Sequence, residues 1–222
     1  MPSVDISDLS RANIYKLLVG SVIPRPIAWV SCAAADGTRN IAPFSFFNVV
    51  SSFPPMLAVS IDKTKTSGQE QKDTLRYITE TEEFVVNIAT VDLLEPLVTS
   101  SLEFPSAVDE FEVTGLTPAP SVTVTPPRIL EAPVSFECTL HTVVDLGESM
   151  LVIGKALHAH FHPDLLDENF SMRVERLRPV GRMPGPTFCT ELNRVSRAPS
   201  PPKCGQDEFP VPPWATAETR PR

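Results

Sequence analysis

Two polar stretches near the N-terminus carry side chains suited to holding an anionic organic ligand. Arg25 stands between two prolines in VIPRPIAWVS, and flanking prolines lower the entropy cost of holding a guanidinium in place. In the loop stretch APFSFFN, Ser45 and Asn48 offer hydrogen bonds among phenylalanine side chains. Each stretch alone also fits a plainer interpretation, a solvated arginine in the first case and a core aromatic cluster in the second.

A third stretch, SGQEQKDT, has the side chains that a phosphate group prefers. Ser67, Lys72 and Thr74 supply hydroxyl and ammonium donors, and residues 72–74 open a predicted helix. Backbone N–H groups at a helix start favour phosphate. The same residues also fit an ordinary helix start capped by Asp73 or Ser67. If the three stretches converge in the fold, they predict a site for an anionic ligand.

Three histidines near residue 160 form another group with chemical potential. His158, His160 and His162 fall on one face of an extended strand, where imidazoles can bind zinc or iron. Asp164 is the only acidic neighbour evident in the sequence. We interpret this face as a strand end at a dimer interface or pocket rim, with no metal, and keep His160 as a secondary catalytic candidate that would touch a nicotinamide or substrate.

The short motifs that identify many enzyme classes are absent from the sequence. The chain has no GxGxxG, GxxxxGK[ST], GxSxG or HExxH pattern. A nicotinamide cofactor, if used, is therefore not held by a Rossmann fingerprint.

Strands and short helices must position these residues. Helices are predicted over 12–20, 72–81 and 91–101, the last weakened by Pro96. Strands are predicted from about Asn40 and over 27–34, 56–61, 84–88, 134–144 and 150–162, with a hairpin turn at Asp36-Gly37. Both faces of the first half of 150–162 are apolar, so we expect both to be covered. Residues 108–127 are expected to form a long ordered loop with short regular pieces.

The order of these elements favours a mainly β, antiparallel fold. Strands predominate, and they do not alternate with helices as they do in βαβ units. A barrel or sandwich with short peripheral helices is therefore predicted. A net charge of -8 argues against a nucleic-acid partner. The chain has no run of 18 apolar residues, so no membrane span is expected.

The cysteines and the N-terminal sequence indicate in which cellular compartment the protein is expected. Cys32, Cys138, Cys189 and Cys204 include no pair with CxxC spacing, which favours reduced thiols in an intracellular protein. The N-terminus lacks a basic start followed by an apolar stretch, so no secretory signal is expected. A cytoplasmic location follows as the expectation.

Proline is the outlier of the composition, with 24 residues, many of them near the C-terminus. A segment so rich in proline cannot form a helix or a central strand. We expect one domain over residues 1–197 and a tail over 198–222 that is disordered or extended along a partner surface. Phe209 and Trp214 give this tail apolar side chains for docking.

The segments VIPRPIAWVS, DG, NIAPFSFFN, PP, KDT and EFVVNI follow one another in an order and at spacings that resemble the flavin reductase-like, FMN-binding split-barrel family. The resemblance continues through LVIGKALHAH to LRPVGRMPGPTFC and covers residues 12–190. It implies a Greek-key split β-barrel that forms a homodimer, with FMN bound near the subunit interface.

The resemblance also implies roles for individual residues. The isoalloxazine and its ribityl chain would be contacted by Arg25, Pro26, Ile27, Ala28, Ser45, Phe46, Asn48, Ser60 and Ile61. The phosphate would be surrounded by Ser67, Lys72, Asp73 and Thr74, and Arg182 would approach from the C-terminal segment. FMN suits such a set, because its dianionic phosphate prefers cationic and N–H donors and its ring prefers backbone hydrogen bonds and flat apolar walls.

The chain departs from the family pattern just after Arg182. Pro184-Gly185 stands where the family has Gly-Gly, and Phe188 stands where it has tyrosine. A phenol that could donate a hydrogen bond is therefore missing, which bears on the shape of the pocket mouth and on the substrate.

The activity that the resemblance implies is that of an FMN-dependent oxidoreductase. NADH or NADPH would reduce the flavin, which would pass electrons to oxygen, to a partner oxygenase or to a small organic molecule. The protein would thus be a flavin reductase or a flavin-dependent oxygenase-type enzyme. Two alternatives stay open: a non-catalytic FMN-binding carrier, and a related split barrel that binds haem, against which Lys72 and Thr74 argue.

Overall fold

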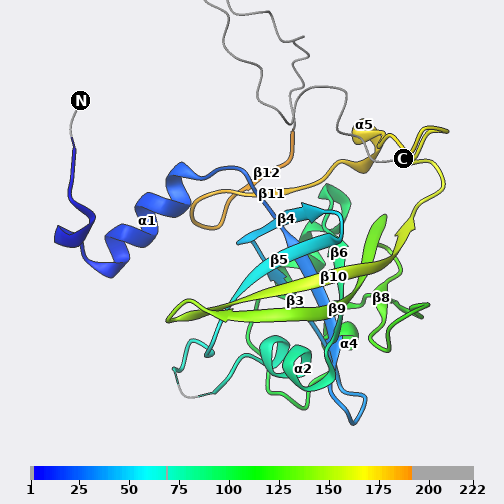
Figure 1. The fold of residues 1–222 in the computed structure, drawn as a ribbon, viewed down its shortest axis with the longest axis horizontal. Helices are drawn as coiled ribbons and strands as arrows, with labels where there is room; N and C mark the ends of the chain where they lie inside the picture. Colours follow the sequence, from blue (N-terminus) through cyan, green and yellow to red (C-terminus); the bar gives the residue numbers. More distant parts are fainter. Residues whose placement is uncertain (1–2, 69, 192–222) are drawn as a thin grey trace, which may run out of the picture. The chain divides into compact units, whose positions relative to one another are not determined.

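The main sheet of the protein has seven antiparallel strands in the order β3-β2-β6-β9-β10-β5-β4, as the computed structural model of residues 3–68 and 70–191 shows (Figure 1). Its strands are β2 (Ala28–Ala33), β3 (Arg39–Phe44), β4 (Phe47–Ser52), β5 (Pro55–Asp62), β6 (Glu83–Ile88), β9 (Val134–Asp145) and β10 (Ser149–Phe161). The sheet curls so that β3 approaches β5. Its edge strands β3 and β4 are not neighbours in the hydrogen-bonded order, so the barrel stays split.

Two smaller sheets join distant parts of the chain. β1 (Arg25–Pro26), β11 (Gly181–Arg182) and β12 (Phe188–Cys189) form a three-stranded sheet, and β7 (Pro118–Ala119) pairs with β8 (Arg128–Ile129). A Cβ atom at Gly181 would lie 2.7 Å from Cβ of Pro24, so the close approach of β11 to the chain before β1 requires glycine there. This pairing brings the C-terminal segment of the domain to the Pro-Arg-Pro stretch.

The helices are short and lie around the sheet. They are α1 (Arg11–Ser21), α2 (Asp73–Thr81), α3 (Leu94–Thr99), α4 (Glu110–Thr114) and α5 (Val174–Leu177), with 3-10 turns η1 (Ile6–Asp8) and η2 (Val91–Leu93). α2 packs Leu75, Tyr77 and Ile78 into the core of the barrel. None of the helices within the described ranges is long and apolar enough to cross a membrane.

β2 is buried on both faces, which explains its nearly continuous apolar sequence. Ala28, Val30 and Cys32 belong to the barrel core, which also contains Phe84. Trp29 belongs to a second cluster beneath α3 and α4, where its indole N–H donates to Ser100 Oγ at 2.9 Å. On the far side of the barrel core, Cβ of an alanine at position 154 would lie 2.3 Å from Phe84 Cζ, so Gly154 is needed for this packing.

Most predicted elements are confirmed, and the differences have local causes. The helix expected over 91–101 is divided into η2 and α3. Pro96 falls in the first turn of α3, where its missing N–H costs little. Residues expected as a loop after Ser45 instead form the edge strand β4, whose bulge between Val49 and Ser51 breaks the period of two that identifies strands.

Only one face of β10 is fully buried, contrary to the expectation of two covered faces. Val152 and Gly154 are buried, whereas Leu151 and Ile153 are half-buried and Leu157 is exposed. The predicted tail at 198–222 and Cys204 lie outside the described residues.

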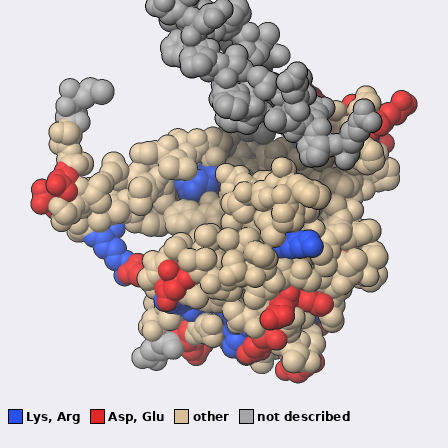
Figure 2. Space-filling model, in the orientation of Figure 1, with Lys and Arg blue, Asp and Glu red and all other residues tan. Residues whose placement is uncertain are grey.

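Apolar side chains are exposed on α1 and β4 and in the residues next to these elements. They are Tyr15, Leu17, Leu18, Val22, Ile23, Phe46, Val49, Val50 and Phe53. Figure 2 shows that charged side chains gather over α2 and the turns beside it, while the surface over β4 and β5 is largely uncharged in this view. A surface of this kind on a folded domain marks an interaction site.

Candidate flavin-binding groove

Two adjoining pockets share Pro43 of β3 and Ser101, and together they form a groove. The narrow pocket has a volume of about 80 Å³ and is lined by Asn40, Lys65, Lys72, Thr74, Glu103 and Glu110, among others. The wide pocket has a volume of about 330 Å³ and is lined by Tyr15, Arg25, Ser45, Leu97, Arg182 and Phe188, among others. The wide pocket alone has the size of a small-molecule site.

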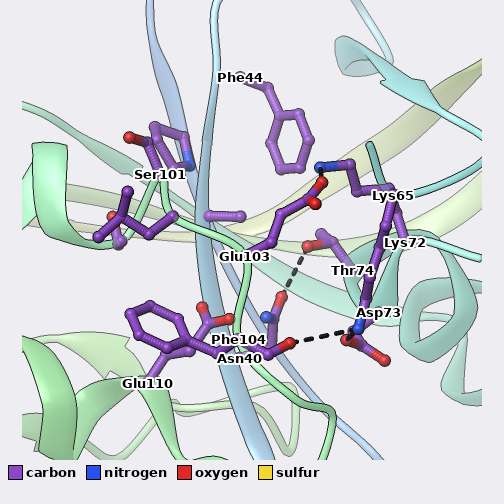
Figure 3. A pocket seen from close by; sticks show the side chains of 14 residues that line it. Asn40, Phe44, Lys65, Lys72, Asp73, Thr74, Ser101, Glu103, Phe104 and Glu110 are labelled. Carbon is purple, nitrogen blue, oxygen red and sulfur yellow. Dashed lines mark hydrogen bonds and ion pairs between the residues drawn. The ribbon is translucent and has the colours of Figure 1, made fainter. Parts of the chain in front are cut away.

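The cations and hydroxyl of the narrow pocket are already engaged (Figure 3). Lys72 Nζ lies 2.7 Å from Glu103 Oε1, and Lys65 Nζ lies 2.9 Å from Asp73 Oδ2. Thr74 Oγ1 donates to Asn40 Oδ1 at 2.6 Å. An anion entering this pocket therefore has to displace a carboxylate from its lysine.

The start of α2 borders the narrow pocket. Lys72 occupies the N-cap position and its side chain makes no capping hydrogen bond, so neither Asp73 nor Ser67 stands at the N-cap. The carboxylate of Asp73 instead pairs with Lys65 and Arg76. As an anion it would repel a phosphate, so Asp73 contributes here by holding Lys65 in place.

Glu110 is a buried carboxylate at the inner wall of the narrow pocket, and sequence patterns do not identify it. Its Oε2 accepts a hydrogen bond from the Ile41 N–H at 2.9 Å. Burial, with the nearby Asp73 acting in the same direction and the Ile41 N–H opposing the shift, raises the pKa of Glu110 to about 7. The narrow pocket thus contains a group that changes charge near neutral pH.

Arg25 is built into the wall of the wide pocket. Its side chain is buried, and Nη1 donates to the carbonyl oxygens of Val19 at 2.6 Å and Val22 at 3.1 Å. Nε lies 3.4 Å from Ser45 Oγ. Arg25 therefore ties the end of α1 to the chain before β4, and its charge stays beside the pocket.

Arg182 stands directly opposite Arg25 in the β1–β11 pair. Its guanidinium carbon lies 4.8 Å from the centre of the Phe188 ring. Within the described ranges, this guanidinium makes no hydrogen bond or ion pair with another side chain. The mouth of the wide pocket therefore carries an uncompensated positive charge stacked on an aromatic ring.

The Flavin reductase like domain model matches residues 19–179 of this chain. The chain belongs to the flavin reductase-like family. Two solved structures are similar over nearly their whole length. The 2-nitrobenzoate 2-nitroreductase of Pseudomonas fluorescens is 34% identical, with a TM-score of 0.81 over 91% of this chain and 98% of that one. Component B of nitrilotriacetate monooxygenase from Bacillus cereus is 31% identical, with a TM-score of 0.84 over 89% and 98%.

The fold of this flavin reductase-like protein is the split barrel that the resemblance implies. A flavin reductase structure with a split barrel domain from Shewanella frigidimarina covers 88% of this chain and 96% of its own with a TM-score of 0.76. At 17% identity this match supports the assignment of the fold and nothing further.

The groove of this flavin reductase-like protein gathers about half of the residues expected at the flavin. Arg25, Ile27, Ser45 and Arg182 line the wide pocket, and Lys72, Asp73 and Thr74 line the narrow one. Phe46 lies beside Arg25, with its ring centre 6.0 Å from the guanidinium carbon. The lining does not include Pro26, Ala28, Asn48, Ser60, Ile61 or Ser67.

Three of these outlying residues have other places in the fold. Ala28 and Ile61 are buried in the barrel core. The Ser60 N–H donates to the carbonyl of Phe46 at 2.8 Å. β2 and most of β5 are buried on both faces, so the strand pattern does not tell which of their residues face the groove.

The histidines lie outside the groove and have an acidic partner that sequence patterns miss. His160 Nε2 lies 2.6 Å from Oε1 of Glu137 on the neighbouring strand β9, so the expectation that Asp164 is the only acidic neighbour is wrong. The rings of His158 and His160 lie 4.8 Å apart. No group of three potential metal ligands occurs within residues 3–68 and 70–191. His160 is not among the residues that line either pocket, and its Nε2 contacts Glu137.

Glu137 accepts four hydrogen bonds although its side chain is fully buried. They come from His160, from the N–H of Val122 and from both the N–H and the hydroxyl of Thr123. Burial alone would raise the pKa of Glu137, but these hydrogen bonds outweigh it and lower the pKa to about 2. The carboxylate thereby fastens the loop around 122–123 onto the barrel.

Proposed function

We propose that this protein is an FMN-dependent oxidoreductase for which NADH or NADPH is the electron donor. The groove is the observation that carries this proposal: it combines a helix start with ammonium and hydroxyl donors at one end and apolar walls at the other. Among the described residues neither pocket is lined by a histidine or a cysteine, so this part of the chain offers the groove no imidazole or thiol for covalent or general-base catalysis. FMN would supply the redox chemistry in such a site.

The narrow pocket is the proposed phosphate end of the groove. A phosphate there would meet the N–H groups of the first turn of α2, together with Lys72 and Thr74 once these leave Glu103 and Asn40. Lys72 becomes available when Glu103 turns away, because the phosphate and the Glu103 carboxylate compete for the same ammonium group. Glu103 is exposed enough at 31% to make that turn without disturbing the core.

The wide pocket is the proposed place of the ring system and of the molecule that exchanges electrons with it. Ile27, Pro43 and Leu97 supply apolar walls, and the hydroxyls of Ser45 and Ser101 supply hydrogen bonds. These walls exclude water from a planar ligand and fix its orientation. Phe188 closes the mouth with an apolar edge, where a tyrosine would have added a hydroxyl.

The proposal has two versions, which differ in the molecule that accepts the electrons from the flavin. Similarity to component B of a monooxygenase supports a flavin reductase that serves a partner oxygenase. Similarity to a nitroreductase supports direct action on a small organic molecule. A non-catalytic FMN carrier is the second candidate, since the groove would serve binding alone equally well; Lys72 and Thr74 favour FMN over haem.

We also propose that the protein acts as a homodimer and in the cytoplasm. The apolar side chains exposed on α1 and β4 support a self-association surface beside the wide pocket, because Tyr15 belongs to both. The free thiols of Cys32, Cys138 and Cys189 support a reducing compartment. Residues 1–197 would form the flavin-binding domain.

The absorbance spectrum of the purified protein tests the cofactor assignment. We expect flavin bands, and FMN as the flavin released on denaturation. Release of FAD in place of FMN would contradict the choice of flavin, and a Soret band would contradict flavin binding itself.

A further inference from the structure

We propose that Arg182 recognises a carboxylate on the small molecule that enters the wide pocket, so that this protein acts on aromatic or similarly planar organic acids. The inference rests on the proposed function for the statement that this molecule exchanges electrons with a flavin. The recognition itself follows from the charge, stacking and surroundings of Arg182.

The charge balance of the two pockets differs sharply. In the narrow pocket Lys65 pairs with Asp73 and Lys72 pairs with Glu103, and Glu110 adds a third carboxyl group to the lining. Within residues 3–68 and 70–191, the lining of the wide pocket includes Arg25 and Arg182 but no aspartate or glutamate. Two cations without a counter-charge in a partly enclosed, apolar site create a strong preference for an anion.

The two arginines have different roles in this pocket. Arg25 uses Nη1 and Nε on protein oxygen atoms, so it is fixed in place and acts mainly as a positive charge in the wall. Arg182 stands opposite it, and among the described residues its guanidinium contacts the ring of Phe188 without a hydrogen bond or ion pair. Stacking leaves the edge of a guanidinium open, and that edge presents two parallel N–H groups that match a carboxylate.

The walls define the rest of the ligand. Apart from the two arginines and the hydroxyls of Ser45 and Ser101, the described lining of the wide pocket is aromatic or aliphatic, and it includes Tyr15, Leu97, Val98, Pro186 and Phe188. Its volume of about 330 Å³ suits a small ring-bearing molecule. A planar organic acid would place its ring between these apolar side chains and its carboxylate at Arg182.

The phosphates of FMN or of a nicotinamide dinucleotide share this anionic chemistry, so the experiment has to separate the sources. Isothermal titration of the purified protein with benzoate, and with its uncharged counterpart benzamide, measures carboxylate binding directly. Flavin content and the KM for NADH and NADPH are measured on the same preparations. Since calorimetry does not require a flavin signal, benzoate binding can be judged even if the cofactor assignment is wrong.

Arg182→Gln is the decisive variant, and Arg178→Gln is its matched control. Arg178 pairs with Asp92 at 2.9 Å and lines neither pocket. We expect saturable benzoate binding that Arg182→Gln weakens about tenfold or more, that Arg182→Lys restores in part, and that Arg178→Gln leaves unchanged. Benzamide should bind wild type more weakly, and flavin content should be equal in all variants.

Four results would overturn the proposal. These are no saturable benzoate binding, equal affinity for benzoate and benzamide, loss of flavin from Arg182→Gln with benzoate affinity kept, and a raised KM for NADH or NADPH in Arg182→Gln with benzoate affinity kept. The third would assign Arg182 to the flavin, and the fourth to the phosphates of the electron donor.

Discussion

Lys72 Nζ lies 2.7 Å from Glu103 Oε1 in the pocket where we propose that a phosphate binds. The Glu103 carboxylate also accepts the N–H of Thr66 at 2.9 Å. If the phosphate binds at Lys72 as proposed, it has to take the place of this carboxylate. Release of Lys72 from Glu103 becomes part of the free energy of FMN binding.

Glu103→Gln should accordingly raise the affinity for FMN a few-fold, because the neutral amide competes less for Lys72. Lys72→Gln should lower that affinity about tenfold. Quenching of FMN fluorescence on titration with protein measures both. Lys63→Gln is the control, since Lys63 pairs with Asp145 outside both pockets. Equal FMN affinity in the wild type and both pocket variants would refute the phosphate assignment.

The raised pKa of Glu110 makes the free energy of unfolding depend on pH. Its pKa of about 7 lies above the ordinary value of 4.5, so the folded protein keeps a proton that the unfolded chain releases. The contribution of Glu110 to stability is therefore full below pH 4.5, declines as the pH rises through about 7, and is constant above that. The decline amounts to about 3 kcal/mol.

Urea unfolding of wild type and Glu110→Gln, at about pH 5 and about pH 8, isolates this contribution. Glutamine keeps an oxygen for the Ile41 N–H but cannot ionise. The variant should therefore gain stability relative to wild type at the higher pH alone. A difference between the two proteins that is the same at both pH values would show that Glu110 does not titrate in this range.

Glu137→Gln should destabilise the protein by about 2–4 kcal/mol, because an amide nitrogen would face donors that now meet a carboxylate. Glu131→Gln is the matched control: Glu131 is exposed and accepts only the Thr117 N–H, so we expect a loss of less than about 1 kcal/mol. Chemical unfolding at neutral pH measures both. Equal losses in the two variants would show that the four hydrogen bonds to Glu137 add nothing.

Val49→Asp should dissociate the proposed homodimer, because it places a charge in the apolar surface of β4. Val49 is 63% exposed, so the fold of a single subunit should tolerate the change. Light scattering should give twice the chain mass for wild type and the single chain mass for the variant. Val113→Asp, at an exposed position of α4, should leave the mass unchanged. A wild-type mass of one chain would contradict the homodimer.

Some elements of the fold can be predicted from local sequence patterns, and others cannot. β-branched and apolar runs such as that of β2 identify strands well, because burial on both faces leaves few polar residues. The edge strand β4 could not be read, since its bulge and its exposed Val49 and Val50 hide the alternation. The pairing of β1 with β11 needs contacts between the two ends of the domain, which no local pattern contains.

The sequence indicates several residues that line the groove, but it does not indicate the carboxylates that lie beside them. Lys72, Thr74, Ser45 and Arg182 line the groove as expected. Glu103 and Glu110 come from a loop and a short helix without a phosphate-type pattern, so the carboxylates that balance the lysines could not be placed. Likewise, Glu137 alternates on β9 like an outward-facing residue, and only the loop around 122–123 makes it buried.

The central claim, that the groove binds a flavin which a nicotinamide donor reduces, is tested most directly by mixing the purified protein with NADH or NADPH without oxygen. We predict that one of the two donors bleaches the flavin absorbance at a catalytic rate, and that admitting air restores it. Protein-bound flavin that stays oxidised with both donors would contradict the claim and favour a carrier.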